Sequence, residues 1–323
     1  MTKEKINFRQ ARDFTETFNV SIKFLRQNFK MFFQCLILIA GPFVLISSIA
    51  GAFYQSHAIS MMSLAKLGSN VNAFSRIIDQ FGWTYAIFII ATIVASLMMV
   101  NTVFSFMIIY NEKGPEEITM NEVSTKVIKN IGNVLSIFLS FTFTTILILV
   151  VIVGIIIGIS SGVPALGILL VFLLVIGLMI VLPPIMWLLS AMYLVKMNEG
   201  ISVSESFTKT KDALRGNFWW TWVIFVCAGI AVMIANFAFA LPQAAYQMVL
   251  MFTRLKGSTD EVSVSFLIVA TVCTFCTTTL YSVMHVISGF HYFSLAEKND
   301  GKGLLERIDE IGTTPTNNVE QHF

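Results

Sequence analysis

SVSESFTKTKDALRGNF, residues Ser202–Phe218, is the stretch that decides how this chain folds, because related copies of it stand at two other places. The first copy is Asp13–Phe29, DFTETFNVSIKFLRQNF, and the middle copy, Thr119–Val134, TMNEVSTKVIKNIGNV, is weaker and one residue shorter. Residues of the first copy recur in the third at a constant offset: Glu16 as Glu205, Phe18 as Phe207, Leu25 as Leu214, Arg26 as Arg215, Asn28 as Asn217 and Phe29 as Phe218. The sequence therefore contains an internal repeat.

Each copy begins with the pattern of a helix start, in which a cap residue stands three positions before a Glu. The pairs are Asp13 with Glu16, Thr119 with Glu122, and Ser202 with Glu205. In such a capping box the two side chains accept hydrogen bonds from each other's backbone N–H groups. An apolar stripe at helical spacing follows in the first copy: Phe18, Ile22, Leu25 and Phe29. We expect an amphipathic helix along the cytoplasmic membrane surface.

Each copy then runs into a long apolar segment. Only 12% of the 323 residues are charged, whereas soluble domains carry about 25%. A bilayer core about 30 Å thick needs about 20 helical residues. The stretches of that length without a central charge are 32–54, 84–110, 134–159, 165–195, 218–241 and 264–294. The sequence therefore predicts a polytopic membrane protein with six spans and leaves almost nothing for a soluble domain.

Together these features predict an all-α fold and a single membrane domain over residues 1–323. We expect three parallel repeats, each made of a cytoplasmic interfacial helix, a span out and a span back. The repeats cover residues 13–110, 119–195 and 202–296, and a polar cytoplasmic tail follows at 297–323. Copies that point the same way are related by an axis along the membrane normal.

The distribution of positive charge predicts the orientation. With six spans, 17 of the 21 Lys and Arg residues fall on the side of the two termini. The other side holds only Lys66, Arg76, Arg254 and Lys256. The positive-inside rule therefore places both termini in the cytoplasm.

Several local features carry further expectations. Residues 1–12 are short, polar and basic, which is typical of a mobile tail. The outer loops are expected at 55–83, with an amphipathic helix resting on the outer face, and at 243–263. A short turn at 160–164 predicts an antiparallel hairpin of spans three and four. Glycines four residues apart would let those helices approach closely: Gly154, Gly158 and Gly162. Helix breaks or bends are expected at two pairs: Gly41 with Pro42, and Pro183 with Pro184.

One group of residues has the composition of a metal site, namely Cys273, Cys276 and His285. Its spacing argues against that role, because nine residues separate Cys276 from His285 and place them on opposite faces, about 14 Å apart along one straight helix. We expect the cysteines to be packing residues. His285 alone is a candidate proton-relay group, although it lies near the cytoplasmic headgroups, where a His costs little.

The polar residues of the spans are few. Asn101 and Asn236 are the strongest intramembrane candidates, and interhelical hydrogen bonding is their simplest role. No span carries a central charge, which argues against an ion-coupled transporter. The sequence contains no Walker motif or HExxH. We therefore expect no catalytic residues, no metal ligands and no cofactor, and we predict that the protein is not an enzyme.

The three surface helices would form a basic collar at the cytoplasmic headgroups, and collars of this kind bind anionic lipid. The candidate lipid contacts are Lys23, Arg26, Lys30, Lys126, Lys129, Lys209, Lys211 and Arg215. The simpler alternative is that these helices only anchor the spans.

Residues 202–222, with their echoes at 13–33 and 119–135, resemble the membrane domain of some bacterial glycerophosphodiester phosphodiesterases. They also resemble related stand-alone six-span proteins of unknown function. The other spans match only in apolar character. The catalytic barrel of the phosphodiesterases has no counterpart here, because no segment could supply its carboxylates and histidines, so that activity is not carried over. The resemblance implies a protein of the bacterial inner membrane.

Our leading hypothesis is a non-enzymatic scaffold or lipid-engaging component of a membrane complex. Its partners would be membrane lipids, anionic ones in particular, and a protein partner or a second copy of the chain stays open. No nucleic acid is expected. The alternative hypothesis is a permease or flippase for an apolar or lipid-like solute, moving around the two proline pairs.

Overall fold

The computed structural model describes residues 4–66, 71–115, 117–255, 264–301 and 305, which form helices and connections without a strand. Within them, six stretches are long and apolar enough to span a membrane: Phe14–Ile59, Gly82–Lys113, Met120–Gly162, Ala165–Glu199, Phe218–Thr253 and Val264–Asp300. The all-helical fold and the six candidate spans are confirmed, and this is the fold of a multi-pass membrane protein.

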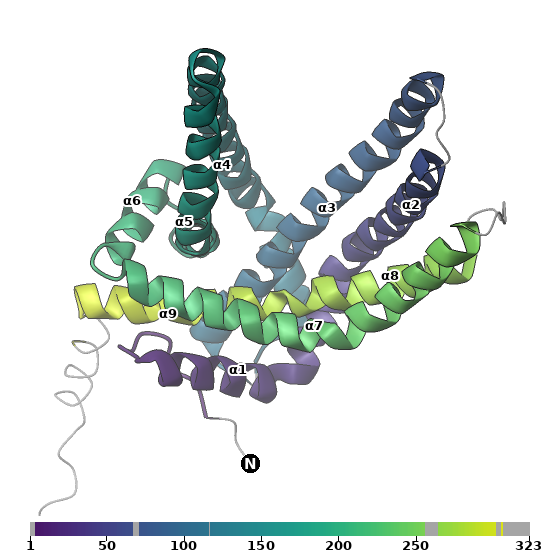
Figure 1. Cartoon of the computed structure of the whole chain (residues 1–323). Helices are drawn as coiled ribbons and strands as arrows, with labels where there is room; N and C mark the ends of the chain where they lie inside the picture. The colour runs from purple at the N-terminus through teal and green to yellow at the C-terminus, as the bar shows by residue number, and fades with distance from the viewer. Residues whose placement is uncertain (1–3, 67–70, 116, 256–263, 302–304, 306–323) are drawn as a thin grey trace, which may run out of the picture.

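The elements follow in the order α1 (Phe14–Cys35), η1 (Leu36–Ala40), α2 (Gly41–Lys66), α3 (Val71–Lys113), α4 (Met120–Gly162), α5 (Pro164–Glu199), α6 (Val203–Leu214), α7 (Phe218–Leu255), α8 (Val264–Leu280) and α9 (Ser282–Asp300). In Figure 1, α2 with α3 and α4 with α5 rise as two diverging pairs from a common base. Helix α2 packs on both α3 and α8, whereas the apolar part of the α4–α5 pair has most of its side chains exposed.

The core lies where the C-terminal parts of α3, α5 and α9 meet, because each of these helices packs against the other two. Each contributes a large, fully buried side chain, represented by Phe104, Trp187 and Phe290. Aromatic side chains bury much apolar surface, so these rings make the junction a well-packed part of the hydrophobic core.

The same three helices end in the same way. Gly114, Gly200 and Gly301 adopt left-handed backbone conformations with φ of 92°, 67° and 61°. Their N–H groups donate to the carbonyls four residues earlier, at 2.8, 2.9 and 2.9 Å. Glycine is favoured here because a side chain would be strained at positive φ. These three glycines thus cap the C-terminal ends of α3, α5 and α9.

The N-terminal segment enters this core. Phe8 is 1% exposed and Ile6 is also buried. The Phe8 ring packs on Tyr110 and Phe290, with centroids 5.6 and 4.8 Å away. The N–H of Ile6 donates to the Tyr110 hydroxyl at 3.0 Å. The prediction of a mobile tail over residues 1–12 is therefore wrong for residues 4–12, because their two apolar side chains fill the core.

Arg12 holds this segment in shape. Its guanidinium is buried and donates to the carbonyl of Phe8 at 2.9 Å and to that of Asn7. The backbone N–H of Arg12 donates to the Ser294 hydroxyl on α9 at 2.8 Å. A buried charge is tolerated when its donors are satisfied, and here backbone carbonyls satisfy them.

The predicted proline breaks do not interrupt the spans. Before Gly41 and Pro42 the chain forms a π-helical turn, Leu36–Ala40, and α2 continues from Gly41. This wider turn accommodates the missing N–H and the bulk of the proline ring. Pro183 and Pro184 lie inside α5, which is continuous from Pro164 to Glu199. A break at Pro183 and Pro184 is therefore contradicted, whereas a bend at either proline pair stays a prediction.

The helices also extend beyond the predicted ends of the spans. Helix α2 reaches Lys66 and α3 begins at Val71, so the expected 55–83 loop is largely helical. The side chains expected to rest on its outer face lie outside the described residues. Helix α7 passes through Pro242 and ends at Leu255, which contradicts an outer loop beginning at residue 243. At the other end, α9 continues to Asp300, so the tail expected from residue 297 begins later.

Span six is interrupted at Tyr281, whereas we predicted one straight helix. Helix α8 ends at Leu280 and α9 begins at Ser282. The N–H groups of Tyr281 and Met284 donate to carbonyls three residues earlier, at 3.2 and 3.0 Å. In the preceding turn the hydroxyl of Thr279 donates to the carbonyl of Phe275 at 2.8 Å. Such back-bonding by Thr bends helices.

The α4–α5 hairpin has the short turn that was predicted, because α4 ends at Gly162 and α5 begins at Pro164. The glycine that allows close approach is a different one. A Cβ at Gly167 would lie 1.9 Å from the Ser160 Oγ and 3.1 Å from its Cα. A Cβ at Gly154, Gly158 or Gly162 would meet no atom within 4 Å. The predicted ridge therefore faces away from the neighbouring helix.

Candidate functional site

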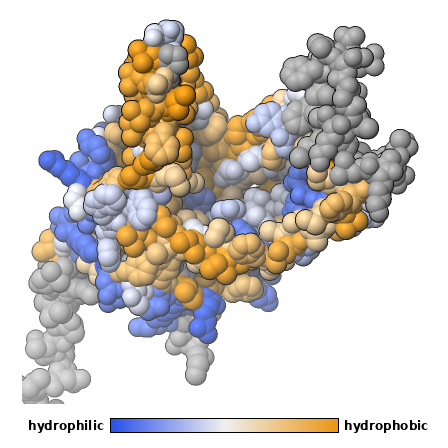
Figure 2. All heavy atoms as spheres, in the orientation of Figure 1, coloured by the Kyte–Doolittle hydropathy of each residue, from blue (hydrophilic) through white to orange (hydrophobic). Residues whose placement is uncertain are grey.

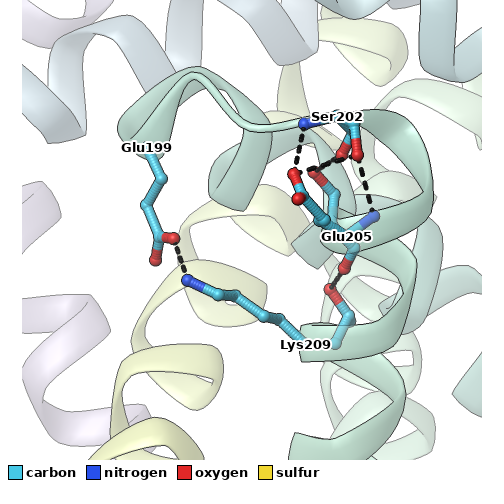
Figure 3. A network of polar contacts seen from close by, with 6 residues as sticks. Glu199, Ser202, Glu205 and Lys209 are labelled. Carbon is cyan, nitrogen blue, oxygen red and sulfur yellow. Dashed lines mark hydrogen bonds and ion pairs between the residues drawn. The ribbon is translucent and has the colours of Figure 1, made fainter.

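The three capping boxes are all formed. Asp13 accepts from the N–H of Glu16 at 2.7 Å, and Glu16 accepts from the N–H of Asp13 at 3.0 Å. The same reciprocal pairs occur at the start of α4, between Thr119 and Glu122, and at the start of α6. Figure 3 shows the third box, in which Ser202 and Glu205 face each other. The sequence pattern thus located three helix starts correctly.

The side chains buried on these capped helices are mostly small or β-branched. They recur at the same distances from the cap: Thr17, Ser21 and Phe24 in α1; Val123, Val127 and Asn130 in α4; Ser206, Thr210 and Ala213 in α6. The apolar stripe recognised in the sequence lies on another face, since Ile22 and Phe29 are 51% and 61% exposed. The equivalent residue of α4, Ile128, is 69% exposed.

Exposed cations accompany these apolar side chains. Five of the eight predicted collar cations make no ion pair with the part of the chain that the structure describes: Arg26, Lys30, Lys129, Lys211 and Arg215. All five are exposed. Figure 2 shows hydrophilic side chains gathered around α1 and α6, and a hydrophobic surface over the α4–α5 pair. The described surface is therefore divided into a polar end and an apolar region.

The other three collar cations pair with carboxylates. Lys126 lies 2.6 Å from Glu112 at the end of α3, and Lys23 lies 3.4 Å from Glu4. Lys209 pairs with Glu199 at the end of α5 (Figure 3). Exposed pairs of this kind stabilise a protein by about 0–1 kcal/mol. Each pair joins a capped helix to a neighbouring segment, and the other five collar cations keep their charge unpaired.

Three cavities open at this polar end. The largest, about 650 Å³, lies between the end of α3, the start of α4 and the end of α5. A second, about 420 Å³, lies between the N-terminal segment and α1. A third, about 280 Å³, is bounded by Arg9 and by the ends of α5 and α9 with α6. We name them the α4, α1 and α6 cavities after the capped helix that lines each.

The two asparagines predicted inside the spans differ in their hydrogen bonding. Asn101 is buried, and its amide donates to the carbonyl of Val127 at 2.9 Å, which joins α3 to α4 as expected. Asn236 is also buried, but its Oδ1 accepts no hydrogen bond from the described residues. Interhelical bonding is thus confirmed for Asn101 and not for Asn236.

His285 contacts α5 and α3 rather than the cysteines of its own span. Its Nδ1 lies 3.2 Å from the Ser190 hydroxyl, and its ring meets that of Phe104 edge to face. Among the described residues no group of three His, Cys, Asp or Glu side chains could hold a metal ion. The structure therefore brings Ser190 and Phe104, rather than Cys273 and Cys276, to His285.

Two features of the structure were not predicted from the sequence. His291 is buried, with its Nε2 3.0 Å from the Thr221 hydroxyl and its ring against Trp187. It stands six residues after His285 and therefore points to a different neighbour. The other feature is the insertion of Phe8 and Arg12. The sequence signal was an apolar Phe within a polar segment, and it is too short to show periodicity.

Comparisons of the chain with protein families, curated proteins and solved structures found no match.

Proposed function

We propose that the protein is a non-enzymatic component of the bacterial inner membrane that engages anionic lipid through its cytoplasmic end. One observation carries this proposal: exposed cations stand beside exposed apolar side chains on the capped helices. Arg26 lies between Ile22 and Phe29 on α1, and Lys129 follows Ile128 on α4. An amphipathic surface of this kind buries apolar side chains among acyl chains and places cations at phosphates.

We further propose that the chain consists of three parallel repeats with both termini in the cytoplasm. The capping boxes, the buried positions at matching distances and the mutual packing of α3, α5 and α9 all support this arrangement. The charge distribution supports the orientation. The resemblance of residues 202–222 to membrane domains attached to phosphodiesterases supports a bacterial membrane protein.

Thermal unfolding in detergent tests the lipid proposal, because a ligand that binds only the folded protein raises Tm. The test variant removes three unpaired cations: Arg26→Gln, Lys211→Gln and Arg215→Gln. The matched control removes three cations that have partners outside the α4 cavity: Lys23→Gln and Lys209→Gln, which pair with carboxylates, and Lys298→Gln, which lies over the Trp220 ring. We expect phosphatidylglycerol to raise the Tm of the wild type and of the control more than that of the test variant. No rise for the wild type, or equal losses in both variants, would contradict the proposal.

A permease or flippase for an apolar or lipid-like solute is the second candidate. It is favoured by the hollow that Figure 2 shows between the α4–α5 pair and α3, above α7. The tightly packed junction of Phe8, Trp187 and Phe290 weighs against it, because a solute would need a path through this core. None of the three cavities described above is lined by Asn101 or His285. Lipid movement between leaflets of reconstituted vesicles would favour this candidate.

A further inference from the structure

The three cavities occupy matching places on the three capped helices. Counted from the cap, the α1 cavity uses Glu16, Asn19, Val20 and Lys23, and the α4 cavity uses their equivalents Glu122, Thr125, Lys126 and Lys129. The α6 cavity uses Lys209, Asp212 and Ala213, equivalent to Lys126, Lys129 and Asn130. The equivalence allows the cavities to be compared position by position.

One position carries a cation in two of the cavities and an anion in the third. It is Lys23 in the α1 cavity, Lys129 in the α4 cavity and Asp212 in the α6 cavity. Lys23 faces a carboxylate of the same chain, since its Nζ lies 3.4 Å from Glu4. The α1 cavity therefore shows that a cation at this position can meet an anionic oxygen, and there the N-terminal segment supplies it.

The α4 cavity leaves the equivalent cation without a carboxylate. Two of its three lysines are paired inside it, Lys113 with Glu122 at 2.5 Å and Lys126 with Glu112 at 2.6 Å. Its third carboxylate, Glu199, pairs with Lys209 outside it. The charge of Lys129 is thus the one that no described carboxylate compensates.

An amide donor lies at the same place. Asn130 is only 5% exposed, and its Oδ1 accepts from the Asn133 amide at 3.1 Å. Its own Nδ2 donates to no described residue. Because Asn130 lines the cavity, this N–H is available to a ligand there. One free ammonium with amide donors suits a group carrying a single negative charge.

We propose that the α4 cavity binds one phosphate group, with Lys129 supplying the charge and Asn130 a hydrogen bond. This deepens the proposed lipid engagement and rests on it, because residues 120–133 precede the apolar part of α4 and so place the cavity at the headgroup level. The phosphate can come from a phospholipid headgroup or from a soluble ester. The α6 cavity does not bind one, because Asp212 repels it.

Native mass spectrometry in detergent tests this with three probes: short-chain phosphatidylglycerol, glycerol 3-phosphate and inorganic phosphate. We expect one adduct on the wild type, at least about tenfold weaker binding for Lys129→Gln and Lys129→Asp, and a second adduct for Asp212→Lys. Adducts with the lipid alone identify a headgroup site. Adducts with all three, with the same dependence on Lys129, identify a soluble phosphate site.

Unchanged binding in both Lys129 variants would overturn the site. If monodisperse Asp212→Lys protein shows no second adduct, the residue at this position does not decide which cavity binds phosphate. The Gln variant keeps the test valid if the Asp variant fails to fold. If only this site fails, phosphatidylglycerol should still raise the Tm of the triple Arg26, Lys211 and Arg215 variant less than that of the wild type. If the wild type also gains no stability from phosphatidylglycerol, the proposed function fails as well.

Discussion

At the scale of single residues, Phe8 is the side chain whose place is least visible in the sequence. It stands among charged and amide residues, yet it packs against aromatic rings from α1, α3 and α9. Period and run length are the signals of burial in a sequence, and one Phe has neither. Its burial depends on a gap that only the assembled helices define.

Replacing Phe8 by Ala should therefore destabilise the protein by about 3–5 kcal/mol, as in other buried Phe→Ala changes. Phe29→Ala is the matched control, because that ring is exposed and should leave stability nearly unchanged. Equilibrium unfolding in detergent micelles measures both. Equal effects of the two changes would show that Phe8 does not hold the core together.

A second residue-scale prediction concerns the α4–α5 hairpin. Gly167→Ala places a methyl group 3.1 Å from the Ser160 Cα, so one helix has to shift and Tm should fall. Gly158→Ala meets open space and should leave Tm unchanged or raise it slightly, because Ala favours helix. Thermal unfolding of the two variants compares them. A larger fall in Tm for Gly158→Ala would show that the glycine ridge is the contact between α4 and α5 after all.

At the scale of elements, the capping boxes were the most reliable sequence signal, because each depends on residues three apart. Ser202→Ala should cost about 1 kcal/mol by removing an N-cap. Ser204→Ala, an exposed change two positions further in the same helix, is the control and should cost little. Hydrogen exchange of the first turn of α6 provides the readout. Equal protection in both variants would argue that the box contributes nothing.

The pH dependence of the same box is predictable. Hydrogen bonds from the backbone and side chain of Ser202 lower the pKa of the Glu205 carboxyl. Its contribution to stability is fully present above the unfolded pKa, about 4.3, and is lost as the pH falls through the lowered folded value. Glu205→Gln should therefore be less stable than the wild type near neutral pH and equal to it in acid. A difference that persists in acid would contradict this assignment.

At this scale the prolines coincided with a helix irregularity at the first pair but not with a break in α5. Gly41 and Pro42, like Pro183 and Pro184, predict breaks by the rules for soluble helices. Inside a bilayer no water is available to satisfy a broken backbone, so the helix is retained. A π turn adapts the first pair, and α5 passes through the second. The real interruption, at Tyr281, follows Thr279, whose hydroxyl bonds to the Phe275 carbonyl of its own helix. The apolar pattern does not reveal it.

At the scale of the whole molecule, composition was sufficient to predict six spans, because each requires only length and the absence of charge. The relative tilt of the helices was not predictable from such signals. Helices α3, α5 and α9 meet at one junction, whereas the α4–α5 pair diverges from α2 and α3 in Figure 1. The equivalence of the α1, α4 and α6 cavities likewise required coordinates, because the α1 cavity is closed by the N-terminal segment.

Native mass spectrometry of the wild-type protein, extracted gently from its own membrane, is the decisive test of the proposed lipid engagement. We expect the protein to keep anionic phospholipid under conditions that strip the surrounding detergent, because unpaired cations stand beside exposed apolar side chains on its capped helices. A bare protein without retained lipid, together with solute or lipid movement in reconstituted vesicles, would contradict it in favour of a permease or flippase.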